Sequence, residues 1–252
     1  MKRLPILLCW LASAPALLAA GADFEARLWA PDLGGGAVLD VAGQSEAIDL
    51  GSDLGLDGDE ALEGRLIWRP SRRTSLRLEY ANFDFGGDAV LQRRLTFAGT
   101  TFDVDAQVSS SLELDYGGLG FAWQFLSTGD GRTRLGPVVE VRGLRGSAAI
   151  RADVAGLLQA NASDEFELGF GAAGLLLDVE PSQRIHAYAR WTRSVGSGDG
   201  TLTDAEAGLR FYPTDVLALT AGYRRLEVDF VDGGEMFDLE LDGPFVGGVV
   251  SF

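Results

Sequence analysis

Residues 75–80 read Ser-Leu-Arg-Leu-Glu-Tyr, so apolar side chains alternate with polar or charged ones at every step. Successive side chains of a β-strand point to opposite faces, and this stretch therefore has one apolar and one charged face. Residues 205–211 read Ala-Glu-Ala-Gly-Leu-Arg-Phe and repeat the pattern. Segments of this kind follow one another along the chain, separated by turn residues, with almost no helical periodicity. The alternation predicts an all-β protein.

Alternating segments account for most of the sequence after residue 22. We predict one domain, residues 23–252, that forms a closed antiparallel up-and-down transmembrane β-barrel of about ten strands; eight strands is the alternative. An even number brings both chain ends to one side, which in bacterial barrels is the periplasmic side. The expected strands are residues 23–31, 61–69, 74–96, 101–126, 133–154, 164–179, 185–197, 203–212, 217–232 and 235–252.

The first 22 residues have the features of a secretory signal peptide. Lys2 and Arg3 form the charged start, residues 4–11 are apolar, and residues 20–22 read Ala-Gly-Ala, which is a small-residue cleavage site. We therefore expect export and a mature chain that begins at Asp23.

Composition and motifs argue against several classes of function. The chain has 37 acidic and 21 basic residues and a net charge of −16, whereas sequence-independent nucleic-acid binding needs a basic surface. The one cysteine, Cys9, lies in the predicted signal peptide, so the mature chain has no disulfide and no thiolate metal site. No Walker, dinucleotide-binding or HExxH motif occurs. We expect no cofactor, no metal site and no nucleic-acid partner.

Three short connections open with proline, and an aromatic residue follows each proline by ten positions: Tyr80, Trp191 and Tyr223. Ten residues of tilted strand span about 25 Å, the height of the lipid-facing band of a barrel. These aromatics are therefore expected at the far membrane interface, and the apolar residues two positions before the prolines at the near one. The predicted interface aromatics are Trp68, Tyr80, Trp191, Phe211 and Tyr223. Leu76, Leu78, Ala187, Ala189, Leu217, Leu219 and Ala221 are expected to face lipid.

Val246, Val250 and Phe252 share one face of the last segment, with Phe252 at its end. This resembles the C-terminal strand of bacterial outer-membrane β-barrel proteins, in which apolar residues alternate before a final aromatic. The resemblance implies that these three residues are a recognition element for the barrel-assembly machinery. It also implies a location in the outer membrane of a Gram-negative bacterium, in contact with lipid and lipopolysaccharide.

Charged residues of the strands fall opposite the apolar face, which in a barrel means that they point into the lumen. The expected register places Arg65 opposite Glu79 and Glu206 opposite Arg224, and such opposed charges form favourable cross-strand pairs. We expect a paired network that fills a narrow lumen; a selectivity lining for a narrow pore is the alternative. The predicted network is Glu63, Arg65, Arg77, Glu79, Glu140, Arg142, Arg190, Glu206, Arg210 and Arg224.

His186 is the only histidine. It lies two residues into a strand that follows a turn, so we expect it to point inward near the periplasmic end. The known outer-membrane barrel enzymes, such as omptin-like proteases, place a catalytic histidine at or near the outer face. The position of His186 therefore favours a structural role, and we expect no catalytic residue.

Two regions are expected to project beyond the membrane. Residues 32–60 contain a crowd of acidic residues and read as a solvated, flexible loop. Residues 86–111 read as an outward extension of two strands that turns near residues 98–100, with Phe97 and Phe102 packed near its tip or binding a partner. The apolar side chains change from one face of the strand to the other after residue 116. Gly117-Gly118 suggests that a β-bulge causes this change.

The expected function is that of an integral outer-membrane barrel with a charge-filled lumen and a structural or surface-interaction role. A narrow porin-like channel for small solutes or ions is the alternative. An outer-membrane enzyme is the least favoured of the three.

Overall fold

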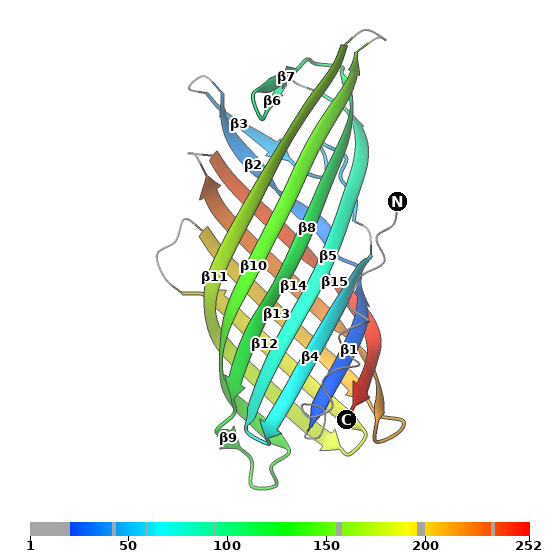
Figure 1. Ribbon diagram of the computed structural model, residues 1–252, viewed down its shortest axis with the longest axis vertical. Coiled ribbons are helices and arrows are strands. Elements are labelled where there is room, and N and C mark those ends of the chain that lie inside the picture. Colours follow the sequence, from blue (N-terminus) through cyan, green and yellow to red (C-terminus); the bar gives the residue numbers. More distant parts are fainter. Residues whose placement is uncertain are drawn as a thin grey trace, which may run out of the picture.

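The computed structural model describes residues 21–252, except 42–43, 59, 93, 155–157, 196–199 and 233–234. Its long strands form one antiparallel sheet that closes because β15 pairs with both β14 and β1 (Figure 1). The ten strands of the closed sheet are β1 (Ala22–Trp29), β4 (Ala61–Ser71), β5 (Thr74–Val90), β8 (Gln107–Trp123), β10 (Thr133–Val154), β11 (Leu158–Ser182), β12 (Ile185–Ser194), β13 (Gly200–Phe211), β14 (Leu217–Asp232) and β15 (Glu235–Ser251). The predicted ten-stranded barrel is confirmed.

β1 begins and β15 ends at the same end of the barrel, since Asp23 pairs with Ser251. We call this the near end and the opposite one the far end. No helix among the described residues is long and apolar enough to cross a membrane. Of the predicted signal peptide, residues 1–20 lie outside the described part of the chain, and Ala22 is the first residue of β1.

The segment expected to be an acidic loop contains two further strands, β2 (Asp32–Val41) and β3 (Gln44–Asp49). β2 continues beyond β1 along the same neighbour, since Asp32–Val38 pairs with Met236–Asp242 of β15. The expectation of an irregular loop over residues 32–49 is therefore wrong. The three consecutive glycines at 34–36 conceal the strand in the sequence, because pairing of the main chain, rather than alternating side chains, defines it.

A small hairpin lies at the far end and forms a sheet of its own (Figure 1). It consists of β6 (Leu95–Phe97) and β7 (Thr100–Phe102), and Ala98 and Gly99 turn it with φ angles of 45° and 75°. The turn lies where the sequence predicts it. The hairpin is not a continuation of β5 and β8, because those strands stop at Val90 and Gln107. A short strand, β9 (Leu126–Ser127), pairs with β10 at the near end.

Outward side chains of the near part of the barrel form an apolar belt. Leu78, Leu219 and Val246 each expose more than half of their surface. Every residue expected to face lipid points outward, and so do Trp68, Phe211 and the three far aromatics. The next outward residues after Tyr80, Trp191 and Tyr223 are Asn82, Arg193 and Arg225. These three aromatics therefore mark the far edge of the belt.

Beyond that edge the apolar and polar faces exchange. On β8, Leu119 and Phe121 point outward, whereas Leu112, Leu114 and Tyr116 point inward and are buried. The pairing of β8 with β5 and β10 runs without a register shift across residues 117 and 118. The predicted bulge at Gly117-Gly118 is therefore wrong. The alternation of side chains is unbroken, and what changes is which face is apolar.

Candidate functional site: the two halves of the barrel interior

The near half of the interior is filled by eleven charged side chains, which we call the charge network. Nine of the ten predicted residues belong to it, joined by Arg27 and Asp204. Its members come from β1, β4, β5, β10, β12, β13 and β14: Arg27, Arg65, Arg77, Arg142, Arg190 and Arg224, with Glu63, Glu79, Glu140, Asp204 and Glu206. Ten of them are buried, and the eleventh, Arg77, is partly buried, with 14% of its side chain exposed.

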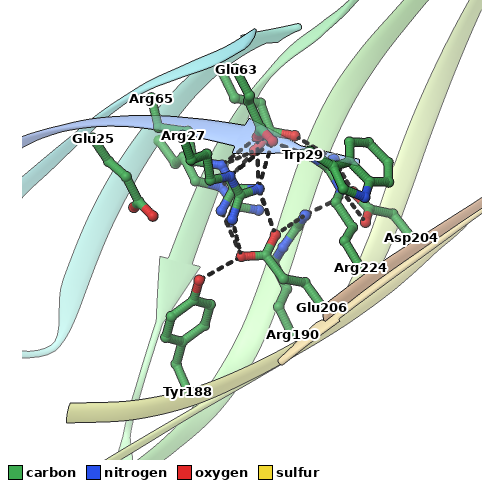
Figure 2. Close-up of polar contacts among 12 residues, drawn as sticks. Glu25, Arg27, Trp29, Glu63, Arg65, Tyr188, Arg190, Asp204, Glu206 and Arg224 are labelled. Atoms are coloured by element: carbon green, nitrogen blue, oxygen red, sulfur yellow. Dashed lines mark hydrogen bonds and ion pairs between the residues drawn. The ribbon is translucent and has the colours of Figure 1, made fainter. Parts of the chain in front are cut away.

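Each carboxylate of the charge network contacts at least three arginines. Figure 2 shows the part of the network around Glu63, Asp204 and Glu206. Arg27 binds both Glu63, at 2.8 and 2.9 Å, and Glu206, at 2.8 and 3.1 Å. These contacts join residues up to 179 positions apart in the sequence. Arg65 also donates to Glu206, at 2.5 and 2.7 Å. Two-pronged contacts of this kind are the strongest geometry for a guanidinium and a carboxylate.

A second group of contacts is made by the arginines of β10, β12 and β14. Arg224 binds Asp204 at 2.8 Å, Glu63 at 2.9 Å and Glu79 at 3.0 Å. Arg190 binds Asp204 at 2.7 Å and Glu140 at 2.9 Å. Arg142 contacts both Glu79 and Glu140. The charge network thus crosses the lumen in several directions, and its six arginines face five carboxylates.

The residues of the two predicted cross-strand pairs lie opposite each other in the register, but their side chains also form ion pairs with other residues. Arg65 lies opposite Glu79, with 3.4 Å between the ion-pairing atoms. Glu206 lies opposite Arg224 in the register, yet its ion pairs go to Arg27, Arg65 and Arg190. Long side chains cross the lumen because a closed barrel brings distant strands within their reach. Nearest-strand pairing alone therefore does not predict the partners.

Arg210, the tenth predicted residue, lies outside the charge network. It pairs with Glu25 of β1 at 2.6 Å. Sequence reasoning missed Glu25, Arg27 and Asp204, although the signal was present. Glu25 and Arg27 alternate along β1 as the other inward charges do, and Asp204 has the same parity as Glu206.

Glycines make room for the arginines on the strands that contribute no charge. A Cβ atom at Gly118 of β8 would lie 2.6 Å from Cδ of Arg142, and one at Gly247 of β15 would lie 2.5 Å from Cβ of Arg27. Neither position could carry a larger side chain without moving its neighbour. Gly118 thus serves packing in the lumen rather than a bulge.

An aromatic layer separates the charge network from the far half of the interior. The guanidinium of Arg224 lies 4.9 Å from the ring centre of Trp29 and 5.2 Å from that of Tyr116. Arg27 lies 4.1 Å from the ring centre of Phe245. The Tyr116 hydroxyl donates to Asp204 at 3.2 Å. These rings present their faces to cations, a favourable arrangement that is stronger when desolvated.

The far half of the interior is apolar, and we call its cavity the far chamber. It has a volume of about 90 Å³, and its lining includes Leu112, Ile150, Phe166, Phe230 and Phe237. The Phe230 ring packs on those of Phe166 and Phe237, with centres 5.3 and 4.8 Å apart. The strands therefore build a core here of the kind found in water-soluble proteins.

Two segments fold over the far chamber. Leu54 and Leu56 are buried and line it from the acidic segment, and Phe97 lines it from the β6–β7 hairpin. Phe102 is also buried, at 2% exposure. Phe97 and Phe102 thus pack inward, one of the two expected outcomes. The acidic segment is solvated only in part, because its leucines point inward.

Two exposed residues of the far chamber's lining carry a carboxylate: Asp164, on the inward face of β11, and Asp238, on the outward face of β15. Partial burial and the carboxylate of Asp229 on the neighbouring strand raise the pKa of Asp238. No group of three or more histidine, cysteine or acidic side chains suited to a metal ion occurs among the described residues.

His186 points inward at the near end and pairs with Asp178 at 2.9 Å. Asp178 also accepts a hydrogen bond from Gln124. The only histidine of the chain is thus held by a carboxylate at the end opposite the far chamber.

The sequence matches no protein-family model and no curated relative. Several solved structures, however, are similar to this chain in fold. The outer-membrane protease OmpT from Escherichia coli is similar with a TM-score of 0.58 and 10% identity, over 92% of this chain and 97% of OmpT. Neisserial surface protein A gives a TM-score of 0.36 at 11% identity, over 92% and 97% of the two chains. The toluene transporter TodX from P. putida gives a TM-score of 0.37 at 11% identity, over 94% of each.

At these identities the similarity concerns the fold and not the activity. The closed ten-stranded sheet, the outward apolar belt and the aromatic edge of that belt agree with it. The fold of this chain is that of the bacterial outer-membrane β-barrel proteins.

Proposed function

We propose that this protein is a closed, non-conducting barrel of the outer membrane, with its near end in the periplasm and a structural or surface-interaction role at its far end. The charge network is the observation that carries the proposal. Its buried side chains meet across the lumen, and each carboxylate is held by several arginines. An ion would have to break such contacts to pass, and uncompensated buried charges are costly.

A non-catalytic role is supported by the position of His186. It lies at the near end, paired with Asp178, whereas the far half of the interior is lined mainly by apolar side chains. The far strands and the segments folded over them carry the surface that a partner outside the cell would meet. We place the interaction role there.

Single-channel recording on refolded protein in planar bilayers tests the proposal. The wild type should be silent, and Glu79→Ala should leak, because it removes the carboxylate that contacts Arg65, Arg142 and Arg224. The matched control is Glu167→Ala, which removes an exposed glutamate paired with Arg145 and should stay silent. Steady, large conductance from the wild type would contradict the closed lumen and favour the porin-like alternative.

A further inference from the structure

The lining of the far chamber includes a buried hydroxyl that has no hydrogen-bond partner among the described residues. Ser110 lies on the inward face of β8, lines the far chamber and is 94% buried, since only 6% of its surface is exposed. Among the described residues, none provides a hydrogen-bond partner for its hydroxyl. Buried polar groups are nearly always paired, and an unpaired hydroxyl costs free energy. The unpaired hydroxyl is therefore a candidate hydrogen-bond partner for a ligand in the far chamber.

Water is a poor occupant of this place. A buried water usually makes about three hydrogen bonds, whereas the walls around Ser110 are Leu112, Ile150 and other apolar side chains. Apolar cavities of comparable size stay dry and accept small apolar molecules. The far chamber thus suits a ligand with an apolar body and a single hydrogen-bonding group.

Charge narrows the class of ligand further. Asp164 and Asp238 are exposed beside the far chamber, so an entering carboxylate or phosphate would be repelled. A membrane lipid is also disfavoured, because the far chamber lies beyond the belt, where β10 and β11 face outward with Arg145 and Glu167. At about 90 Å³, the cavity accommodates a body no larger than one small ring or a short alkyl chain.

We propose that the far chamber is a binding site for a small neutral alcohol or phenol, whose hydroxyl pairs with that of Ser110 while its apolar body packs between Leu112, Ile150 and Phe166. The site lies on the far side of the aromatic layer formed by Trp29 and Tyr116. Its occupancy therefore does not depend on whether the charge network conducts.

Fluorine NMR of 4-fluorophenol and fluorobenzene tests the proposal, with refolded protein in lipid nanodiscs and empty nanodiscs as the reference for partitioning. Saturable binding of 4-fluorophenol to the wild type, above the reference, is expected. Ser110→Ala should weaken that binding about three- to tenfold, the share of one hydrogen bond, and leave fluorobenzene unchanged. Ser163→Ala is the matched control, because Ser163 is exposed on the outward face of β11.

A second variant, Ala148→Leu, fills the cavity with three added carbons and should abolish binding of both compounds. Circular dichroism and heat-modifiable gel mobility establish that each variant is folded. The proposal is overturned if the wild type behaves like empty nanodiscs, or if folded Ala148→Leu binds as the wild type does. Equal affinity of the wild type and Ser110→Ala for 4-fluorophenol would equally overturn the pairing with Ser110.

Discussion

The near and far halves of the interior are built from the same strands with the same alternation, yet they are opposite in chemistry. On β14, Arg224 points into the charge network, whereas Leu226, Val228 and Phe230 point inward beyond it and are buried. On the outward face the order is reversed, with Leu219 and Tyr223 followed by Arg225. The apolar face of a strand thus changes side once along its length.

The reversal follows from what surrounds the barrel. Along the belt the outward face meets hydrocarbon, so apolar residues belong there and the polar ones turn inward and must satisfy one another. Beyond the belt the outward face meets water, and the apolar residues form an ordinary buried core. The change of the apolar face along a strand therefore marks the membrane boundary in the sequence.

The largest expected effect concerns the near half. Glu206→Ala should lower the free energy of unfolding by about 3–5 kcal/mol, because it leaves the buried Arg27 and Arg65 without a carboxylate that both contact. Urea titration of protein in lipid vesicles measures this. Glu167→Ala, at an exposed ion pair, should change it by less than about 1 kcal/mol. Equal losses in the two variants would mean that the stability of the near half does not depend on the ion pairs of the charge network.

Arginine substitutions at two outward positions of β5, one inside the belt and one beyond it, should differ in their cost in unfolding free energy. Leu78→Arg should cost about 2–4 kcal/mol, because it places a charge against lipid. Asp84→Arg, three outward positions further along β5 and beyond Tyr80, should be nearly neutral, since Glu113 lies directly opposite. The same unfolding titration compares them. A cost at position 84 as large as that at 78 would place the membrane boundary elsewhere.

The packing of the far half is tested by a smaller change. Leu54→Ala removes a buried side chain that lines the far chamber and should cost about 2 kcal/mol, the lower end for a site that relaxes. Hydrogen exchange of the amides in residues 49–57 should accelerate as a result. Val104→Ala, at a side chain that is half exposed, serves as the control. Unchanged exchange in Leu54→Ala would show that the acidic segment is not held by its leucines.

The smallest effect is expected at the boundary between the halves. Tyr80→Phe removes the hydroxyl that donates to Asp115 but keeps the ring at the edge of the belt, so the loss should be about 0.5–1.5 kcal/mol. Unfolding in vesicles measures it against the wild type. A loss above that of Leu78→Arg would mean that the hydrogen bond, rather than the ring, positions this edge.

Much of the near half could be predicted because two of its constraints are local. Alternation around Arg77 and Glu79 defines the inward face, and the spacing from Pro70 to Tyr80 matches the height of the belt. The far half was harder to predict. β2 has glycines in place of alternating side chains, and the leucines of the acidic segment follow no period that indicates where they pack. The change of face at residue 116 was visible, but its meaning depends on the solvent outside.

The sequence by itself determined the ten strands of the closed sheet, their inward and outward faces, and most of the charged residues that enter the lumen, because all of these depend on a period of two. Only the tertiary structure decided the partners. Arg27 and Glu206 meet across 179 positions because closure of the sheet leaves only β14 and β15 between β13 and β1, and no local pattern encodes that proximity. The far chamber has the same origin, since Ser110 and Phe230 share a cavity only once β8 and β14 stand on opposite walls of one barrel.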